Sequence, residues 1–132
     1  MNGLLRNMVA LGAVGMMSMS PAFAGQSLGV YQTTDRKMDW GLELCGDDGK
    51  RLCITLLDAR GGSDTPAIKP WIGKLIVSGA KPAGNNKWKG NIRIGDHTLN
   101  GSLTLWPGEK LVMAGCAYIV ICDEATLIPA LP

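Results

Sequence analysis

The four cysteines of this 132-residue chain fall into two close pairs, and this spacing constrains the fold more than any other feature. Cys45 lies near Cys53, and Cys116 lies near Cys122. In an exported protein, such pairs form disulfides that cross-link a small domain. The pattern therefore predicts a compact fold in which each pair joins segments that are adjacent in sequence.

The first 24 residues predict export. A short basic start is followed by the apolar run Met8–Met19 and by the small-residue sequence Pro21–Ala24. This is the pattern of a secretory signal peptide with cleavage after Ala24. We therefore expect residues 1–24 to be a signal peptide and residues 25–132 to form one domain, in the periplasm of a bacterium or secreted from it.

Charge and hydropathy exclude two classes of partner. The chain has 13 Lys and Arg against 11 Asp and Glu, with the two signs intermixed. Nucleic-acid binding requires a basic stripe, which this sequence lacks. After the signal, no apolar run approaches the roughly 20 residues of a membrane-spanning helix. We expect neither a nucleic-acid partner nor a membrane-spanning segment.

Short alternating apolar runs, separated by turn residues every eight to twelve positions, predict an all-β fold. No segment shows a helical period. The pattern favours an all-β sandwich or barrel of about eight strands, joined mostly by tight turns. The expected strands are 29–34, 40–46, 51–58, 71–78, 88–94, 97–105, 109–116 and 121–128.

One hairpin can be predicted residue by residue. Gly95-Asp96 is a typical two-residue hairpin loop between alternating segments. It places Ile92 opposite Leu99, Gly90 opposite Gly101, and Trp88 opposite Leu103. These residues share the apolar face, and the intervening residues are polar.

The same reasoning applies to the first cysteine pair. A turn centred on Gly49 would set Leu44 against Ile54 and would bring Cys45 opposite Cys53 on the outer face. Directly opposed residues lie within disulfide reach. Four cysteines allow three pairings, and we favour the two local ones, Cys45–Cys53 and Cys116–Cys122. The second requires a reversal at residues 118–120, which contain no turn former.

Two connections depart from the meander. The segment Asp58–Pro70 is the longest irregular one and is a candidate flap over one end of the barrel. The segment Gly79–Lys87 is predicted to be a second, glycine-rich loop.

The order of several short motifs resembles a known family. The motifs are Gly29-Val30-Tyr31, Cys45-Gly46, Leu52-Cys53, Trp71-Ile72-Gly73-Lys74, Trp88-Lys89-Gly90, Gly95-Asp96, Leu103-Thr104-Leu105, Gly115-Cys116 and Cys122. Together they are similar to a family of small exported bacterial proteins classified only as a domain of unknown function. The resemblance implies a compact antiparallel barrel like that of lipocalins and streptavidin, and it implies no activity. With it, we predict a small antiparallel meander β-barrel of about eight strands. The chain departs from the family at Tyr118-Ile119-Val120, where glycines are usual, and at the last strand, Thr126–Pro129.

The sequence contains no constellation for catalysis or metal binding. His97 is the single histidine, and the nearest serine, Ser102, is expected on the opposite face of its strand. One histidine and four paired cysteines do not supply a metal site. We therefore predict no catalytic residues, no metal and no cofactor, and a protein that is not an enzyme.

The tryptophans are the feature with a functional interpretation. Trp40, Trp71 and Trp88 are candidate ligand-binding residues, because aromatic side chains at a barrel mouth offer rigid apolar area. Core packing is the alternative, since the domain has no phenylalanine after residue 24. Two hypotheses follow: a binding module for a small apolar envelope molecule, or a protein-interaction module, such as an inhibitor of a secreted hydrolase, that uses Asp58–Pro70.

Overall fold

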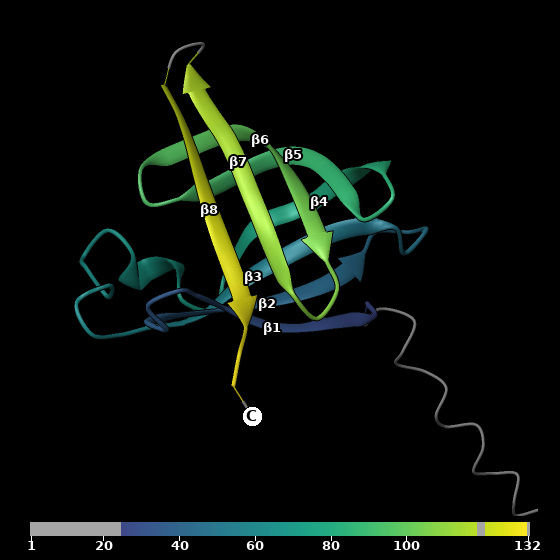
Figure 1. Ribbon diagram of the computed structural model, residues 1–132. Helices are drawn as coiled ribbons and strands as arrows, with labels where there is room; N and C mark the ends of the chain where they lie inside the picture. Colours follow the sequence, from purple (N-terminus) through teal and green to yellow (C-terminus); the bar gives the residue numbers. More distant parts are fainter. Residues whose placement is uncertain (1–24, 119–120, 132) are drawn as a thin grey trace, which may run out of the picture.

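The computed structural model describes residues 25–118 and 121–131, which form a closed barrel of eight antiparallel strands (Figure 1). Each strand pairs with the next one in the chain, and β8 returns to β1, so the predicted fold class is confirmed. The predicted signal peptide lies outside the described residues. The strands are β1 (Ser27–Thr33), β2 (Met38–Cys45), β3 (Arg51–Ala59), β4 (Leu75–Gly84), β5 (Lys87–Ile94), β6 (His97–Trp106), β7 (Lys110–Tyr118) and β8 (Ile121–Pro129).

Inward side chains from all eight strands form the core of the barrel. Leu42, Ile54, Leu103 and Leu127 are completely buried, and each lies on a different strand. Among the described residues, no polar or charged residue is buried. The apolar alternation along the strands therefore becomes a single core, as expected for a barrel of this size.

The β5–β6 hairpin has the predicted register. Ile92 pairs with Leu99, Gly90 with Gly101, and Trp88 with Leu103. The turn residue Gly95 has a φ of 61°, a left-handed conformation that glycine adopts without steric cost. The residues of the turn and the alternation of apolar and polar residues along both strands require the same register.

The predicted register of the β2–β3 hairpin is wrong by two residues. Leu44 pairs with Leu52, not with Ile54, and Cys45 pairs with Arg51. The connecting turn is centred on Asp48, because Gly46 also takes a left-handed conformation and its carbonyl accepts a hydrogen bond from Gly49. A shift of two residues leaves every side chain on its predicted face.

Both predicted disulfides are present. Cys45 and Cys53 are diagonal neighbours on the outer face, with Cα atoms 5.9 Å apart. Cys116 and Cys122 are directly opposed on β7 and β8, with Cα atoms 3.9 Å apart. The turn between them includes residues 119–120, which are outside the described part of the chain.

The predicted boundaries of the fourth strand are wrong. The strand begins at Leu75, because residues 69–71 form a short 3-10 helix instead. It continues to Gly84 through most of the predicted loop Gly79–Lys87. Pro82 pairs with Trp88 and lies next to an irregularity of the β4–β5 pairing between Pro82 and Gly84, and such irregular positions are among the places where a sheet accepts proline. Asn86, with a φ of 53°, makes the turn into β5.

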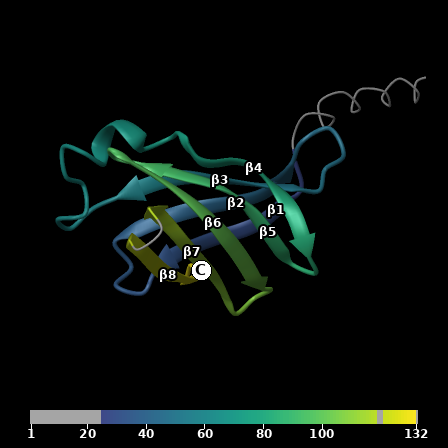
Figure 2. The same ribbon diagram turned by 90° about the horizontal axis from the view of Figure 1, so that it is seen from above.

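Successive turns lie at opposite ends of the barrel, so every second turn is at the same end. We call one of these ends the flap end, because it carries the connection 60–74 between β3 and β4, here called the flap. The β1–β2 and β5–β6 turns lie at the same end, on the left in Figure 1. The flap lies beside the β5–β6 turn, where Gly95 approaches Ala67 (Figure 2). The long connection was predicted at Asp58–Pro70. It spans residues 60–74 instead, because Asp58 and Ala59 belong to β3 and the next strand begins only at Leu75, and it lies at one end of the barrel.

The closure between β1 and β8 is short. Only Tyr31, Gln32 and Thr33 of β1 pair with β8, and the last of them pairs with Leu127. Residues 121–126 therefore extend beyond the end of β1 toward the flap end. This extension forms one side of the barrel mouth.

Candidate functional site: an apolar cavity under the flap

An apolar cavity of about 330 Å³ opens at the flap end of the barrel. The buried side chains of Trp40, Ile76, Ile92 and Met113 line its inner part. They come from four different strands, β2, β4, β5 and β7, so the cavity lies inside the barrel. Its volume is within the range of about 300–1,000 Å³ that is typical of small-molecule sites.

The outer part of the cavity is lined by half-buried and exposed residues. Ile68 of the flap and Ile94 and Leu99 beside the β5–β6 turn form apolar walls. Asp123 and Glu124, together with Ala125, line the cavity and are exposed, so they mark its mouth. The cavity is therefore apolar inside and acidic where it meets water.

Gly115 shows how the strand sequence leaves room at this end. It pairs with Gly101 of β6 on one side and with Asp123 of β8 on the other, and it lines the cavity. A Cβ atom at Gly115 would lie 3.0 Å from the Cβ of Leu99. Any larger residue there would push against the cavity wall.

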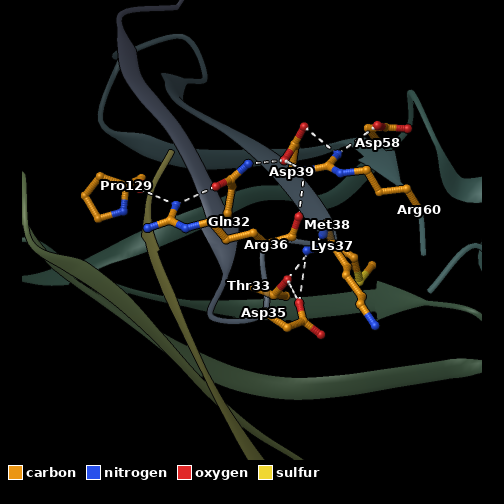
Figure 3. A network of polar contacts seen from close by, with 10 residues as sticks. All are labelled: Gln32, Thr33, Asp35, Arg36, Lys37, Met38, Asp39, Asp58, Arg60 and Pro129. Atoms are coloured by element: carbon orange, nitrogen blue, oxygen red, sulfur yellow. Dashed lines mark hydrogen bonds and ion pairs between the residues drawn. The ribbon is translucent and has the colours of Figure 1, made fainter. Parts of the chain in front are cut away.

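An ion-pair network fastens the start of the flap to the barrel (Figure 3). The Arg60 guanidinium donates to both carboxylate oxygens of Asp39, at 3.0 and 2.9 Å. It also donates to Asp58 at 2.8 Å and to the backbone carbonyl of Arg36 at 2.7 Å. This planar, bidentate geometry suits arginine and would not be reproduced by lysine.

The same network reaches the barrel closure. Gln32 of β1 donates to Asp39 at 2.7 Å and accepts a hydrogen bond from Arg36 at 2.6 Å. Arg36 also donates to the carbonyl of Pro129 on β8, at 3.3 Å. The flap, the β1–β2 turn and the end of β8 are thereby linked through polar side chains.

The network lowers the pKa of Asp39. The main cause is the hydrogen bonding from Arg60, assisted by Gln32 and opposed by partial burial of the carboxyl. A folded-state pKa below the unfolded value means that the carboxylate stabilises the protein above about pH 4, the usual unfolded value. This contribution is lost as the pH falls through the folded-state pKa.

We expect Asp39→Asn to reduce the free energy of unfolding at pH 7 by less than about 1 kcal/mol, because Arg60 is 41% exposed and water screens the pair. The difference from the wild type should vanish near pH 2. Urea unfolding at pH 7, 5 and 2 measures it. The control is Asp58→Asn, which removes a more exposed partner of Arg60 and should have a smaller effect. An equal effect of both variants at pH 7 would contradict the role given to Asp39.

The structure does not bring the three candidate tryptophans together. Trp40 is 5% exposed and lines the cavity. Trp88, 6% exposed, lies toward the opposite end, where it lines a smaller hollow of about 160 Å³ with Tyr31. Trp71 packs half-buried against the core and faces a hollow on the outer side of β4 and β5. Only Trp40 therefore has the position of a cavity residue.

The two buried indoles differ in their hydrogen bonding. The Trp88 Nε1–H donates to the carbonyl of Lys50 at 2.9 Å and ties β5 to the β2–β3 turn. The buried Nε1–H of Trp40 has no partner among the described residues. A buried donor without an acceptor reduces stability, usually by about 1–3 kcal/mol.

We therefore expect Trp88→Phe to destabilise the protein by about 1 kcal/mol more than Trp40→Phe. Both changes remove a similar volume from the core, but only the first removes a hydrogen bond. Urea unfolding of the two variants at one pH measures the difference. A larger loss for Trp40→Phe would show that its N–H is satisfied in solution.

The remaining hollows are outside the barrel. One of about 650 Å³ lies beside the Cys116–Cys122 disulfide, and it is lined by polar residues such as Lys89 and Ser102, and by Asp123 and Glu124, which also line the cavity. His97 is exposed. Within residues 25–118 and 121–131, no cluster of three or more His, Cys, Asp or Glu has the arrangement of a metal site. In the same residues, no helix has the length and apolar character needed to cross a membrane.

Most cavity residues were not among the sequence candidates. Ile92 and Leu99 were predicted to lie on the apolar face of their hairpin, Ile68 was part of the predicted loop Asp58–Pro70, and Met113 was not singled out. One signal could have found them: in a meander, every second turn lies at the same end of the barrel. Inward residues that flank those turns, such as Leu99, therefore converge on one mouth.

Comparisons with protein-family models, with curated proteins and with solved structures found no match to this chain. The resemblance inferred from the order of the motifs stays a prediction. The function must be argued from the geometry of the barrel.

Proposed function

We propose that the protein is a non-enzymatic binding module that holds a small apolar molecule in the cavity under the flap. The observation that carries this proposal is an apolar interior, lined by Trp40, Ile76, Ile92 and Met113, that opens at the mouth of the barrel. Apolar cavities of this kind bind apolar molecules, because water gains no hydrogen bonds inside them. The flap supports this role, since Ile68 covers the cavity while Arg60 fastens the flap at its base.

The proposed location is the bacterial periplasm or the medium. Two disulfides cross-link the barrel, and disulfides persist in oxidising compartments. The N-terminal pattern of a signal peptide supports the same location. A ligand met there would be an apolar molecule of the cell envelope.

Calorimetric titration with 1-decanol tests the binding function. The informative variant is Ala125→Phe, because residue 125 lines the mouth and is exposed, so a larger side chain obstructs entry without filling the core. The matched control is Ala83→Phe, at an exposed site of β4 near the other end of the barrel. We expect one molecule bound per chain, with a loss of affinity of about tenfold or more only in Ala125→Phe. The absence of binding to the wild type, or equal binding by both variants, would contradict the proposal.

A further inference from the structure

The charges around the cavity are of one sign. Of the described residues that line it, two carry a charged group, Asp123 and Glu124, and both are exposed. Successive side chains of a strand point to opposite faces, so Asp123 shares the inward face of the buried Leu127, whereas Glu124 lies on the outer face, where it also lines the hollow that contains Lys89. Neither of them takes part in an ion pair within the described part of the chain. A ligand whose polar end remains at the mouth therefore meets the carboxylate of Asp123, with that of Glu124 on the outer face beside it.

Cations at this end of the barrel do not balance them. Arg60 is bound to Asp39 and Asp58, and Arg36 donates to Gln32. The Lys37 stem lies beside Gly61 on the flap. Lys69, Lys74, Arg93 and His97 are exposed and are also at this end, and none of them lines the cavity.

The volume limits the size of the ligand. Dividing about 330 Å³ by the roughly 30 Å³ that one water molecule occupies in the liquid gives about eleven non-hydrogen atoms. A linear ten-carbon alcohol has this size. Its hydroxyl could remain at the mouth while the chain fills the apolar interior.

We propose that the cavity selects an uncharged apolar molecule of this size and rejects its carboxylate counterpart. The inference rests on the proposed binding function and adds the class of ligand. The selection arises mainly from repulsion by Asp123, with a weaker contribution from Glu124 on the outer face, because two charges near a protein surface interact far more strongly than in bulk water. The exposure of both residues limits the effect, and we expect about a tenfold preference for the alcohol at low salt.

The test compares 1-decanol with decanoate by calorimetry at pH 7.5, below the micellar concentration. The wild type should bind decanol about tenfold more tightly than decanoate. Asp123→Asn/Glu124→Gln should bring this ratio close to one. The matched control, Asp47→Asn/Asp48→Asn, removes the same charge from the exposed β2–β3 turn at the opposite end and should leave the ratio unchanged.

Salt gives a second measurement that does not depend on the variants. Raising NaCl from 20 mM to 500 mM should bring the affinity ratio of decanol to decanoate closer to one in the wild type, because salt screens the repulsion. If neither compound binds, the proposed function fails. If decanoate binds as tightly as decanol to the wild type at low salt, the binding function stands and the selection is refuted. The same conclusion follows if the affinity ratio of decanol to decanoate is changed neither by Asp123→Asn/Glu124→Gln nor by high salt.

Discussion

Replacement of Gly101 by alanine is expected to destabilise the barrel by about 3 kcal/mol, or to prevent folding. Gly90, Gly101 and Gly115 form a row across β5, β6 and β7, each paired directly with the next. A Cβ atom at Gly101 would lie 2.5 Å from the backbone carbonyl oxygen of Ala114. Relief of this contact requires a displacement of β7, because a backbone oxygen cannot rotate away as a side chain can.

Gly41→Ala is the control for this prediction. Gly41 is also a strand glycine, but its Cβ would meet the side chain of Leu57 at 3.2 Å. Leu57 is 44% exposed and can adopt another rotamer. Urea unfolding should therefore show a loss of no more than about 1 kcal/mol for Gly41→Ala. Similar losses for the two variants would mean that β6 and β7 are not as close as the structure shows.

Reduction of both disulfides is expected to cost about 4–5 kcal/mol of stability. Cys45–Cys53 spans eight residues and Cys116–Cys122 spans six. In the chain-entropy model, loops of this size contribute roughly 2–3 kcal/mol each. A small domain has a total stability of about 5–15 kcal/mol, so the reduced protein should be close to unfolding.

Urea unfolding with and without a reductant measures this effect. The double variants Cys45→Ala/Cys53→Ala and Cys116→Ala/Cys122→Ala should each lose about half of the total. Their effects should add, because the two bridges lie in different hairpins, β2–β3 and β7–β8. A reduced protein as stable as the oxidised one would refute the role given to the disulfides.

The faces of the strands could be predicted from the sequence more securely than the registers. The β5–β6 register was correct because Gly95-Asp96 permits one tight turn between alternating strands. The β2–β3 register was wrong by two because both registers place the same side chains inside. Which of the two registers forms depends on the backbone conformation of Gly46, and the pattern of apolar residues does not predict that conformation.

The cavity could be predicted only in part. Alternation shows that Trp40 and Trp88 point inward, and this is confirmed. It does not show at which end of the barrel each one lies, because that depends on strand stagger and closure. The short pairing of β1 with β8 sets the mouth, and it depends on contacts between the two ends of the domain.

The most direct test of the proposed binding site is an NMR titration that follows the indole N–H signals as 1-decanol is added. Trp40 lines the cavity, Trp88 is hydrogen-bonded to Lys50, and Trp106 is 42% exposed on the outer face. The signal of Trp40 should shift and saturate at one equivalent, while those of Trp88 and Trp106 remain in place. An unchanged Trp40 signal, or a larger shift at Trp88, would contradict a ligand site under the flap.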